Sequence, residues 1–283
     1  MLQEEKILLS APNNIQIALW NIKADTSLPQ KHVFLTHGTF SNRKVCMGMA
    51  DFLCQKGYNC WILEWRNHGE SSKTEDFSFE QLANEDFKLA FDYLFQQEGI
   101  KYLDCITHSG GGILLTLYFI FHKEYIDQIK SITTFACQSY GAANNLSSYL
   151  KVLSGHVLGG ILGKLPSRYV GGVHDEPHVF MKQWNRWNMS GRFTGDKGRD
   201  YTADMNKIHV PVLAIAGGGD TFIAPENGCR KYWENFPHPA NQFWLCSKEN
   251  GFRENYSHSR VMHSRNAAEE IYPKVFEWLE GVK

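Results

Sequence analysis

The feature that most constrains the fold is an apolar run that stops at a serine and three glycines. Residues 102–108 are largely apolar, Ser109 and the glycines at 110–112 follow, and a second apolar run extends over 113–121. This order predicts a buried strand, a sharp turn with Ser109 at its apex, and a helix. A serine at such an apex adopts a crowded backbone conformation, which neighbouring glycines relieve while the hydroxyl projects from the sheet edge. The segment therefore predicts a nucleophilic serine.

A serine hydroxyl needs a base, and the base needs an acid that orients it. An aliphatic run from Val210 ends in three glycines and Asp220, which places this acid at the carboxyl-terminal tip of a predicted strand. A polar loop after the predicted strand 241–247 contains His258, which we expect to be the base. His263 lies in the same loop and is the alternative base.

The oxyanion that forms when a serine attacks a carbonyl needs two N–H donors. A predicted strand at 32–37 runs directly into Gly38 and Thr39. We expect the backbone N–H groups of Thr39 and Gly110 to be the two donors of the oxyanion hole.

The chain order of Ser109, Asp220 and His258 resembles that of the α/β-hydrolase superfamily, of the esterase and lipase-like kind. Residues 64–71 resemble the Arg- and Gly-containing loop after the fourth strand of that family. Residues 76–86 and 268–279 are similar to helices of its acid-lipase-like and predicted bacterial members. The resemblance implies an α/β-hydrolase fold, in which helices cover a mostly parallel eight-stranded sheet.

Two residues depart from the family pattern. Thr107 stands where the first glycine of Gly-x-Ser-x-Gly is usual, and Ser257 stands where relatives commonly carry glycine before the histidine. Both positions concern the geometry of the site more than the fold.

Hydrophobic patterning predicts an antiparallel hairpin at 5–11 and 15–22, followed by alternating strands and helices. The strands are expected at 32–37, 58–65, 102–108, 131–138, 210–217 and 241–247, and the helices near 44–56, 79–97, 111–124, 226–235 and 266–280. Residues 140–205 are too many for one crossover. We therefore expect a core at 1–139 and 206–283, with 140–205 inserted as a helical cap over the carboxyl ends of the strands.

The expected cap carries an apolar helix around 152–165 and two tryptophans at helical spacing. These tryptophans either line a pocket above Ser109 or only hold the cap together. His37 is expected to support the oxyanion loop, and His108 to pack beside the nucleophile. The side chains expected at the substrate pocket are His37, Phe40, His108, Trp184 and Trp187.

Composition favours a small, apolar substrate. The 283 residues carry 29 basic and 30 acidic side chains, which excludes a polybasic nucleic-acid or membrane footprint. The amino terminus lacks the charged and apolar regions of a signal peptide, and the longest apolar run is too short for stable membrane insertion. We expect a cytoplasmic protein, and the sequence leaves its oligomeric state open.

No metal or cofactor is expected. The seven cysteines have no paired metal-ligand spacing and are expected to be reduced and buried, with Cys60, Cys105, Cys137 and Cys246 inside strands. The two histidines of the segment 174–178 have ligand-like spacing, but no third ligand is evident, and a solvated loop is the expectation there. The glycine runs lack the spacing of phosphate-binding loops.

These features predict a serine hydrolase that cleaves carboxylic esters of apolar acyl groups through an acyl-enzyme intermediate. Two alternatives stay open at this point. An acyltransferase would use the same residues with an alcohol or thiol in place of water. A non-catalytic, ligand-binding relative would result if Thr107 spoiled the turn at Ser109.

Overall fold

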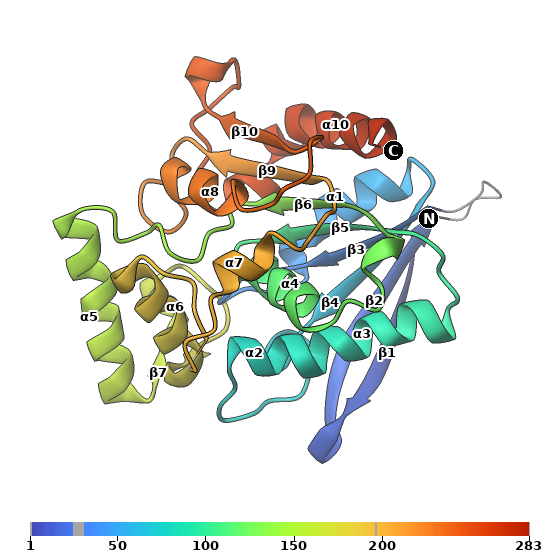
Figure 1. The fold of residues 1–283 in the computed structure, drawn as a ribbon. Helices are drawn as coiled ribbons and strands as arrows, with labels where there is room; N and C mark the ends of the chain where they lie inside the picture. Colours follow the sequence, from blue (N-terminus) through green and yellow to red (C-terminus); the bar gives the residue numbers. More distant parts are fainter. Residues whose placement is uncertain (1, 25–30, 196, 283) are drawn as a thin grey trace.

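Eight strands form one sheet in the computed structural model, which describes residues 2–24, 31–195 and 197–282. The strand order across the sheet is β1-β2-β4-β3-β5-β6-β9-β10 (Figure 1). The β1–β2 and β2–β4 pairs are antiparallel, and the other neighbouring pairs are parallel. The mostly parallel eight-stranded sheet is therefore confirmed. Its strands are β1 (Leu2–Ala11), β2 (Ile15–Ala24), β3 (Lys31–Thr36), β4 (Tyr58–Glu64), β5 (Leu103–His108), β6 (Ile129–Phe135), β9 (Val212–Gly217) and β10 (Gln242–Cys246).

Helices cover both faces of this sheet, as the alternation of strands and helices predicts. The α-helices are α1 (Lys44–Cys54), α2 (Phe79–Leu82), α3 (Lys88–Asp92), α4 (Gly110–Phe121), α5 (Leu146–Leu162), α6 (His178–Ser190), α7 (Tyr201–Met205), α8 (Glu226–Trp233), α9 (Arg260–His263) and α10 (Arg265–Gly281). The other helical turns are η1 (Pro12–Asn14), η2 (Ala83–Phe87), η3 (Tyr93–Gln97), η4 (Ile126–Gln128), η5 (Ser167–Tyr169) and η6 (Lys248–Asn250).

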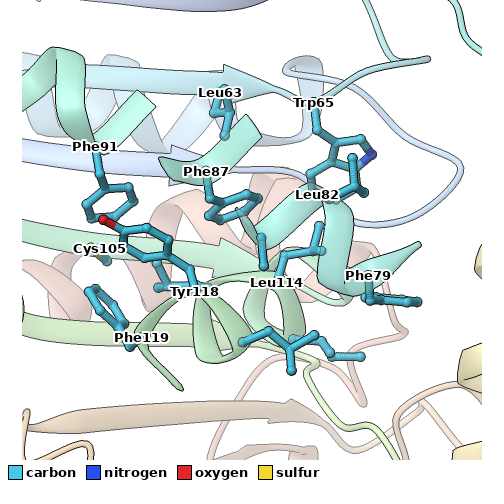
Figure 2. Close-up of a cluster of buried hydrophobic side chains, with 14 of the residues drawn as sticks. Leu63, Trp65, Phe79, Leu82, Phe87, Phe91, Cys105, Leu114, Tyr118 and Phe119 are labelled. Atoms are coloured by element: carbon cyan, nitrogen blue, oxygen red, sulfur yellow. The ribbon is translucent and has the colours of Figure 1, made fainter. Parts of the chain in front are cut away.

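The core has two halves because successive strand residues point to opposite faces. Along β3, Val33 and Leu35 belong to the half formed with α1 and α10, whereas Phe34 belongs to the half formed with α2, α3 and α4. Figure 2 shows Leu114 and Tyr118 of this second helical layer beside the sheet. Strands β4, β5 and β9 are buried at every position, as expected for parallel strands covered on both faces.

Two elements end or wind differently from the sequence prediction. Strand β6 ends at Phe135 instead of 138, because Ala136 has a left-handed φ of 48° that turns the chain out of the sheet. Cys137 therefore lies beyond the strand, although all seven cysteines are buried thiols. The predicted helix at 79–97 is continuous in helical conformation, but η2 and η3 are π-helical turns within it.

The segment between β6 and β9 contains α5, α6, α7 and a two-stranded antiparallel sheet of β7 (Lys164–Leu165) and β8 (Glu176–Pro177). Helices α5 and α6 pack against each other at one side of the main sheet (Figure 1). Phe180 and Trp187 of α6 belong to the same apolar cluster as α2 and α4, so the interior is continuous between this segment and the sheet. The division into a core and a cap at 140 and 205 stays a prediction.

Candidate active site

Ser109 occupies a strained turn between β5 and α4. Its backbone angles are φ 49° and ψ −122°, a conformation that residues other than glycine rarely adopt. The turn is held because the Ser109 N–H donates to the oxygen of Phe135 at 2.8 Å. A Cβ atom on Gly111 would lie 2.4 Å from the backbone oxygen of His37, so glycine is needed where α4 passes this loop. The crowded conformation predicted for the serine is present.

Thr107, the departure from the usual glycine pattern, is accommodated by a third glycine. Its side chain is buried in β5, and its Oγ1 lies 3.5 Å from the oxygen of Thr133. A Cβ atom on Gly112 would lie 3.0 Å from that Oγ1 and 2.6 Å from the Sγ of Cys137. Gly112 therefore leaves the space that Thr107 occupies, and the turn forms without a glycine at 107.

The structure brings Ser109, His258 and Asp220 together from three distant parts of the chain. The Nε2 atom of His258 lies 2.9 Å from the Oγ of Ser109, and its Nδ1 lies 2.6 Å from the Oδ2 of Asp220. With Asp220 ionised, the Nδ1–H group of His258 donates a hydrogen bond to the carboxylate. The Nε2 atom is then free to accept a hydrogen bond from the serine hydroxyl. His263, the alternative base, lies in the wall of the same cavity instead.

Asp220 is held as an oriented carboxylate at the end of β9. Its two oxygens accept hydrogen bonds from the N–H groups of Ile223 and Ala224, each at 3.0 Å. Burial opposes ionisation, but the hydrogen bonds from His258 and from the backbone outweigh burial and place the pKa of Asp220 below its usual value. The acid is therefore ionised at neutral pH and fixes the imidazole orientation.

The glycines before Asp220 make room for the loop that carries His258. The N–H of Gly219 donates to the oxygen of Tyr256 at 2.8 Å. A Cβ atom on Gly217 would lie 2.3 Å from that same oxygen. The glycines therefore have a packing role, because they allow the two loops to approach closely.

Thr39 and Gly110 lie side by side at the start of α4. A Cβ atom on Gly110 would lie 3.3 Å from the backbone nitrogen of Thr39, and both residues line the cavity that contains Ser109 and His258. The N–H of Gly110 is among the first of α4, which have no partner within the helix. The two residues expected to form the oxyanion hole are therefore neighbours at the same cavity.

The cavity at Ser109 has a volume of about 760 Å³. Its wall includes apolar side chains from the segment between β6 and β9, namely Val152, Leu158, Leu165, Met181 and Trp184. Phe40 and His108 also line it, as the sequence predicts. A separate concavity of about 900 Å³ lies along the edge strand β10 and contains none of the predicted site residues.

Two of the five predicted pocket side chains lie elsewhere. Trp187 is 3% exposed, donates from Nε1 to the oxygen of Thr194 and packs in the core against Phe79 and Phe193. His37 is fully buried with its ring centroid 4.0 Å from that of Trp65. It lies behind the oxyanion loop, where its Nδ1 contacts the oxygen of Gly38 at 2.8 Å.

His108 holds the backbone of His258 by a hydrogen bond. Its Nε2 donates to the backbone oxygen of His258 at 3.0 Å. Burial, together with the nearby His258, lowers the pKa of His108 to about 3, so this side chain stays neutral. Its placement fits a packed neighbour of the nucleophile and not a proton carrier.

The loop at 174–178 is less solvated than the sequence suggests. Within the described residues no group of three potential ligands could hold a metal ion. Glu176 is wholly buried, and its Oε1 lies 2.7 Å from the nitrogen of Phe40 and 2.9 Å from the Nε2 of His68. The contact between Glu176 and His68 was not predicted from the sequence. A Glu-Pro pair in a polar stretch carries no pattern that distinguishes it from a surface turn.

Among the described helices, none combines the length and the apolar character needed to cross a bilayer.

Comparison with known proteins agrees with this fold. Residues 31–152 match a family model described as alpha/beta hydrolase fold, and no curated protein sequence matches the chain. An esterase of Pyrococcus furiosus is 18% identical, with a TM-score of 0.65 over 99% of this chain and 91% of its own. An esterase of Exiguobacterium antarcticum is 13% identical, with a TM-score of 0.66 over 98% of this chain and 100% of its own.

A third similar structure is alpha/beta hydrolase domain-containing protein 10 from mouse. It is 15% identical, with a TM-score of 0.66 over 99% of this chain and 100% of its own. At these identities, the structures establish a common fold. With the family match over residues 31–152 and the eight-stranded sheet, they show that the chain has an α/β-hydrolase fold.

Proposed function

We propose that the protein is a serine hydrolase that cleaves carboxylic esters of apolar acyl groups through an acyl-enzyme intermediate. One observation carries the proposal: the hydrogen-bonded chain from Ser109 through His258 to Asp220, built at a strained turn that opens into a cavity. Strained backbone at a cavity costs stability, and it is characteristic of residues with a chemical task.

In this proposal, Ser109 attacks the ester carbonyl while His258 accepts its proton. His258 then protonates the leaving alcohol, and Asp220 stabilises the imidazolium that forms between these steps. The N–H groups of Thr39 and Gly110 stabilise the oxyanion of each tetrahedral intermediate. Water, activated by the same histidine, releases the acid and restores Ser109. These steps use side chains and backbone groups of the chain alone.

The acyl preference is argued from the cavity wall. Val152, Leu158 and Trp184 face the space beside Ser109 and present carbon surface to a bound acyl group. Each buried methylene contributes about 0.8 kcal/mol. Activity on p-nitrophenyl esters is therefore expected to rise with chain length until the wall is covered.

Labelling with a fluorophosphonate probe tests the proposal directly. The wild-type protein should be labelled at Ser109, because phosphonylation requires an activated serine, and Ser109→Ala should not be labelled. A wild-type protein that fails to react would favour the ligand-binding alternative. Product analysis with added alcohols and thiols then separates free acid from transfer product, and predominant transfer would replace hydrolysis by acyl transfer.

A further inference from the structure

Phe40, in the loop that carries Thr39, has a backbone conformation that needs external support. Its φ is 60°, in the left-handed region, which bulky side chains avoid. It is also buried and lines the cavity at Ser109. Such a conformation is unfavourable and persists only where the surroundings hold it.

The support comes from the segment between β6 and β9, more than 130 residues away in the chain. The N–H of Phe40 donates to Oε1 of Glu176 at 2.7 Å. The oxygen of Phe40 accepts from the N–H groups of Val173 and His174, at 2.7 and 3.2 Å. A Cβ atom on Gly172 would lie 2.4 Å from the Cβ of Phe40, so the backbone of this segment also packs directly against the residue.

The carboxylate of Glu176 is itself fixed from the core. His68 places its Nε2 2.9 Å from Oε1 of Glu176 and its Nδ1 2.9 Å from the oxygen of Arg66. The N–H of Arg66 in turn donates to buried Asp86 at 2.8 Å. The carboxylate that holds Phe40 is therefore connected, through His68 and Arg66, to Asp86 in η2.

We propose that Glu176 is a positioning residue for the oxyanion hole, and this rests on the proposed ester hydrolysis. The peptide plane that ends in the Phe40 N–H and the plane that carries the Thr39 N–H share the Cα of Thr39. Fixing the first plane restricts the rotation of the second. Glu176 thus keeps the Thr39 N–H directed toward the oxygen that develops at Ser109, without contacting the substrate itself.

The test compares Glu176→Leu with Gln183→Leu. Gln183 is a matched control, because it is a buried side chain of the same segment whose Oε1 accepts the N–H of Phe79 at 2.8 Å, at the start of α2, which carries no site residue. Removing one oxyanion donor, or displacing it by about 1 Å, costs roughly 100-fold in rate. We expect Glu176→Leu to lower kcat about 10- to 100-fold with KM for a short soluble ester within about threefold, and Gln183→Leu to leave kcat within about threefold.

Two further readouts separate positioning from general destabilisation. The affinity for a trifluoromethyl ketone, whose adduct with a serine carries an oxyanion, should fall with kcat in Glu176→Leu, whereas the affinity for butanoate should not. Hydrogen exchange of the peptide covering 37–43 should accelerate in Glu176→Leu and stay unchanged in Gln183→Leu. Glu176→Gln, which keeps an oxygen acceptor for Phe40, should recover most of the rate.

Gly172→Ala is a second variant in case Glu176→Leu does not fold. Its added methyl group would collide with the Cβ of Phe40. This variant should lower kcat and accelerate hydrogen exchange of the peptide covering 37–43. Unchanged exchange at 37–43 in the folded variants would overturn the proposal. So would equal losses of kcat in Glu176→Leu and Gln183→Leu. A wild-type protein that neither hydrolyses esters nor reacts with the fluorophosphonate would defeat the proposed function, and hydrogen exchange would still decide whether Glu176 holds the loop.

Discussion

The two sides of the candidate site are built in different ways. Ser109, Asp220 and His258 extend from loops at the carboxyl edge of the sheet, where glycines let the loops approach closely. The opposite side comes from the segment between β6 and β9, which contributes Trp184 to the wall and Glu176 to the oxyanion loop. The first side contains the groups that make the nucleophilic attack and transfer protons in the proposed reaction. The second shapes the space around them.

This difference predicts two kinds of mutational effect. Changes at the sheet edge should reduce activity on every ester by the same large factor, because all substrates use the same chemistry. Changes in the segment between β6 and β9 should have smaller effects that depend on the acyl group or on stability.

The largest effect is expected from removing the nucleophile. Ser109→Ala should lower ester turnover on the order of 10⁴-fold or more, equally for short and long esters, because the serine acts as a unit with its base. Turnover of p-nitrophenyl acetate and octanoate checks this. A variant that keeps a tenth of the wild-type activity would remove Ser109 from the mechanism.

Ser109→Gly provides a matched comparison for the strain at the same position. Glycine adopts the backbone angles of Ser109 without a Cβ penalty, so this variant should be more stable than Ser109→Ala by about 1 kcal/mol or more in urea unfolding, while equally inactive. Equal stability of the two variants would contradict a strained turn.

The next effect concerns the acid. Asp220→Asn should keep the packing but lower kcat on the order of 10³- to 10⁴-fold, because the amide no longer orients and stabilises the imidazolium. A matched control is His263→Ala, which should stay within a few-fold of wild type. If His263→Ala loses as much activity as His258→Ala, the base is assigned to the wrong histidine.

Asp220 should also leave a mark on acid stability. Its pKa is lower in the folded protein than its ordinary value, so its contribution to stability is fully present above about pH 4 and is lost as pH falls through the lowered folded pKa. Urea unfolding of wild type and Asp220→Asn from about pH 6 to pH 2.5 measures this difference. The stability gap between the two should narrow toward low pH, and a constant gap would contradict the shifted pKa.

A smaller effect is expected where two loops of the sheet edge meet. Gly111→Ala places a methyl group against the backbone oxygen of His37, and such overpacking destabilises by roughly 1–3 kcal/mol. Gly155→Ala on α5 is a matched control, because no atom lies within 4 Å of the added carbon. It should stabilise the helix by up to about 1 kcal/mol, and the two melting temperatures should shift in opposite directions.

The smallest rate effect is expected from the cavity wall, and it separates two neighbouring tryptophans. Trp184 faces the cavity, so Trp184→Ala should flatten the dependence of kcat/KM on acyl length, by roughly 10-fold on long esters, with acetate little affected. Trp187 packs in the core, so Trp187→Ala should cost about 3–5 kcal/mol of stability and lower all esters in parallel. Identical chain-length profiles for the two variants would contradict the assignment of Trp184 to the wall.

Much of this architecture follows from the sequence because it depends on short-range patterns. Alternating buried strands and helices define the sheet, and Ser109 with the glycines that follow it forms a short contiguous motif that the sequence itself displays. The grouping of Ser109, Asp220 and His258 was predictable since each lies in the turn or loop that follows a predicted strand, and parallel strands bring their carboxyl ends to one edge.

Other features depended on the tertiary structure, because they join residues with no common periodicity. Trp184 and Trp187 are one helical turn apart, yet whether either faces the cavity is decided by how α6 packs on α2. Gly112 is matched to Thr107 through side-chain packing across the turn, which no motif records. Glu176 looks like a solvated acid in the sequence, and only the folded chain buries it against Phe40 and His68, where hydrogen bonds replace the water lost by its Oε1.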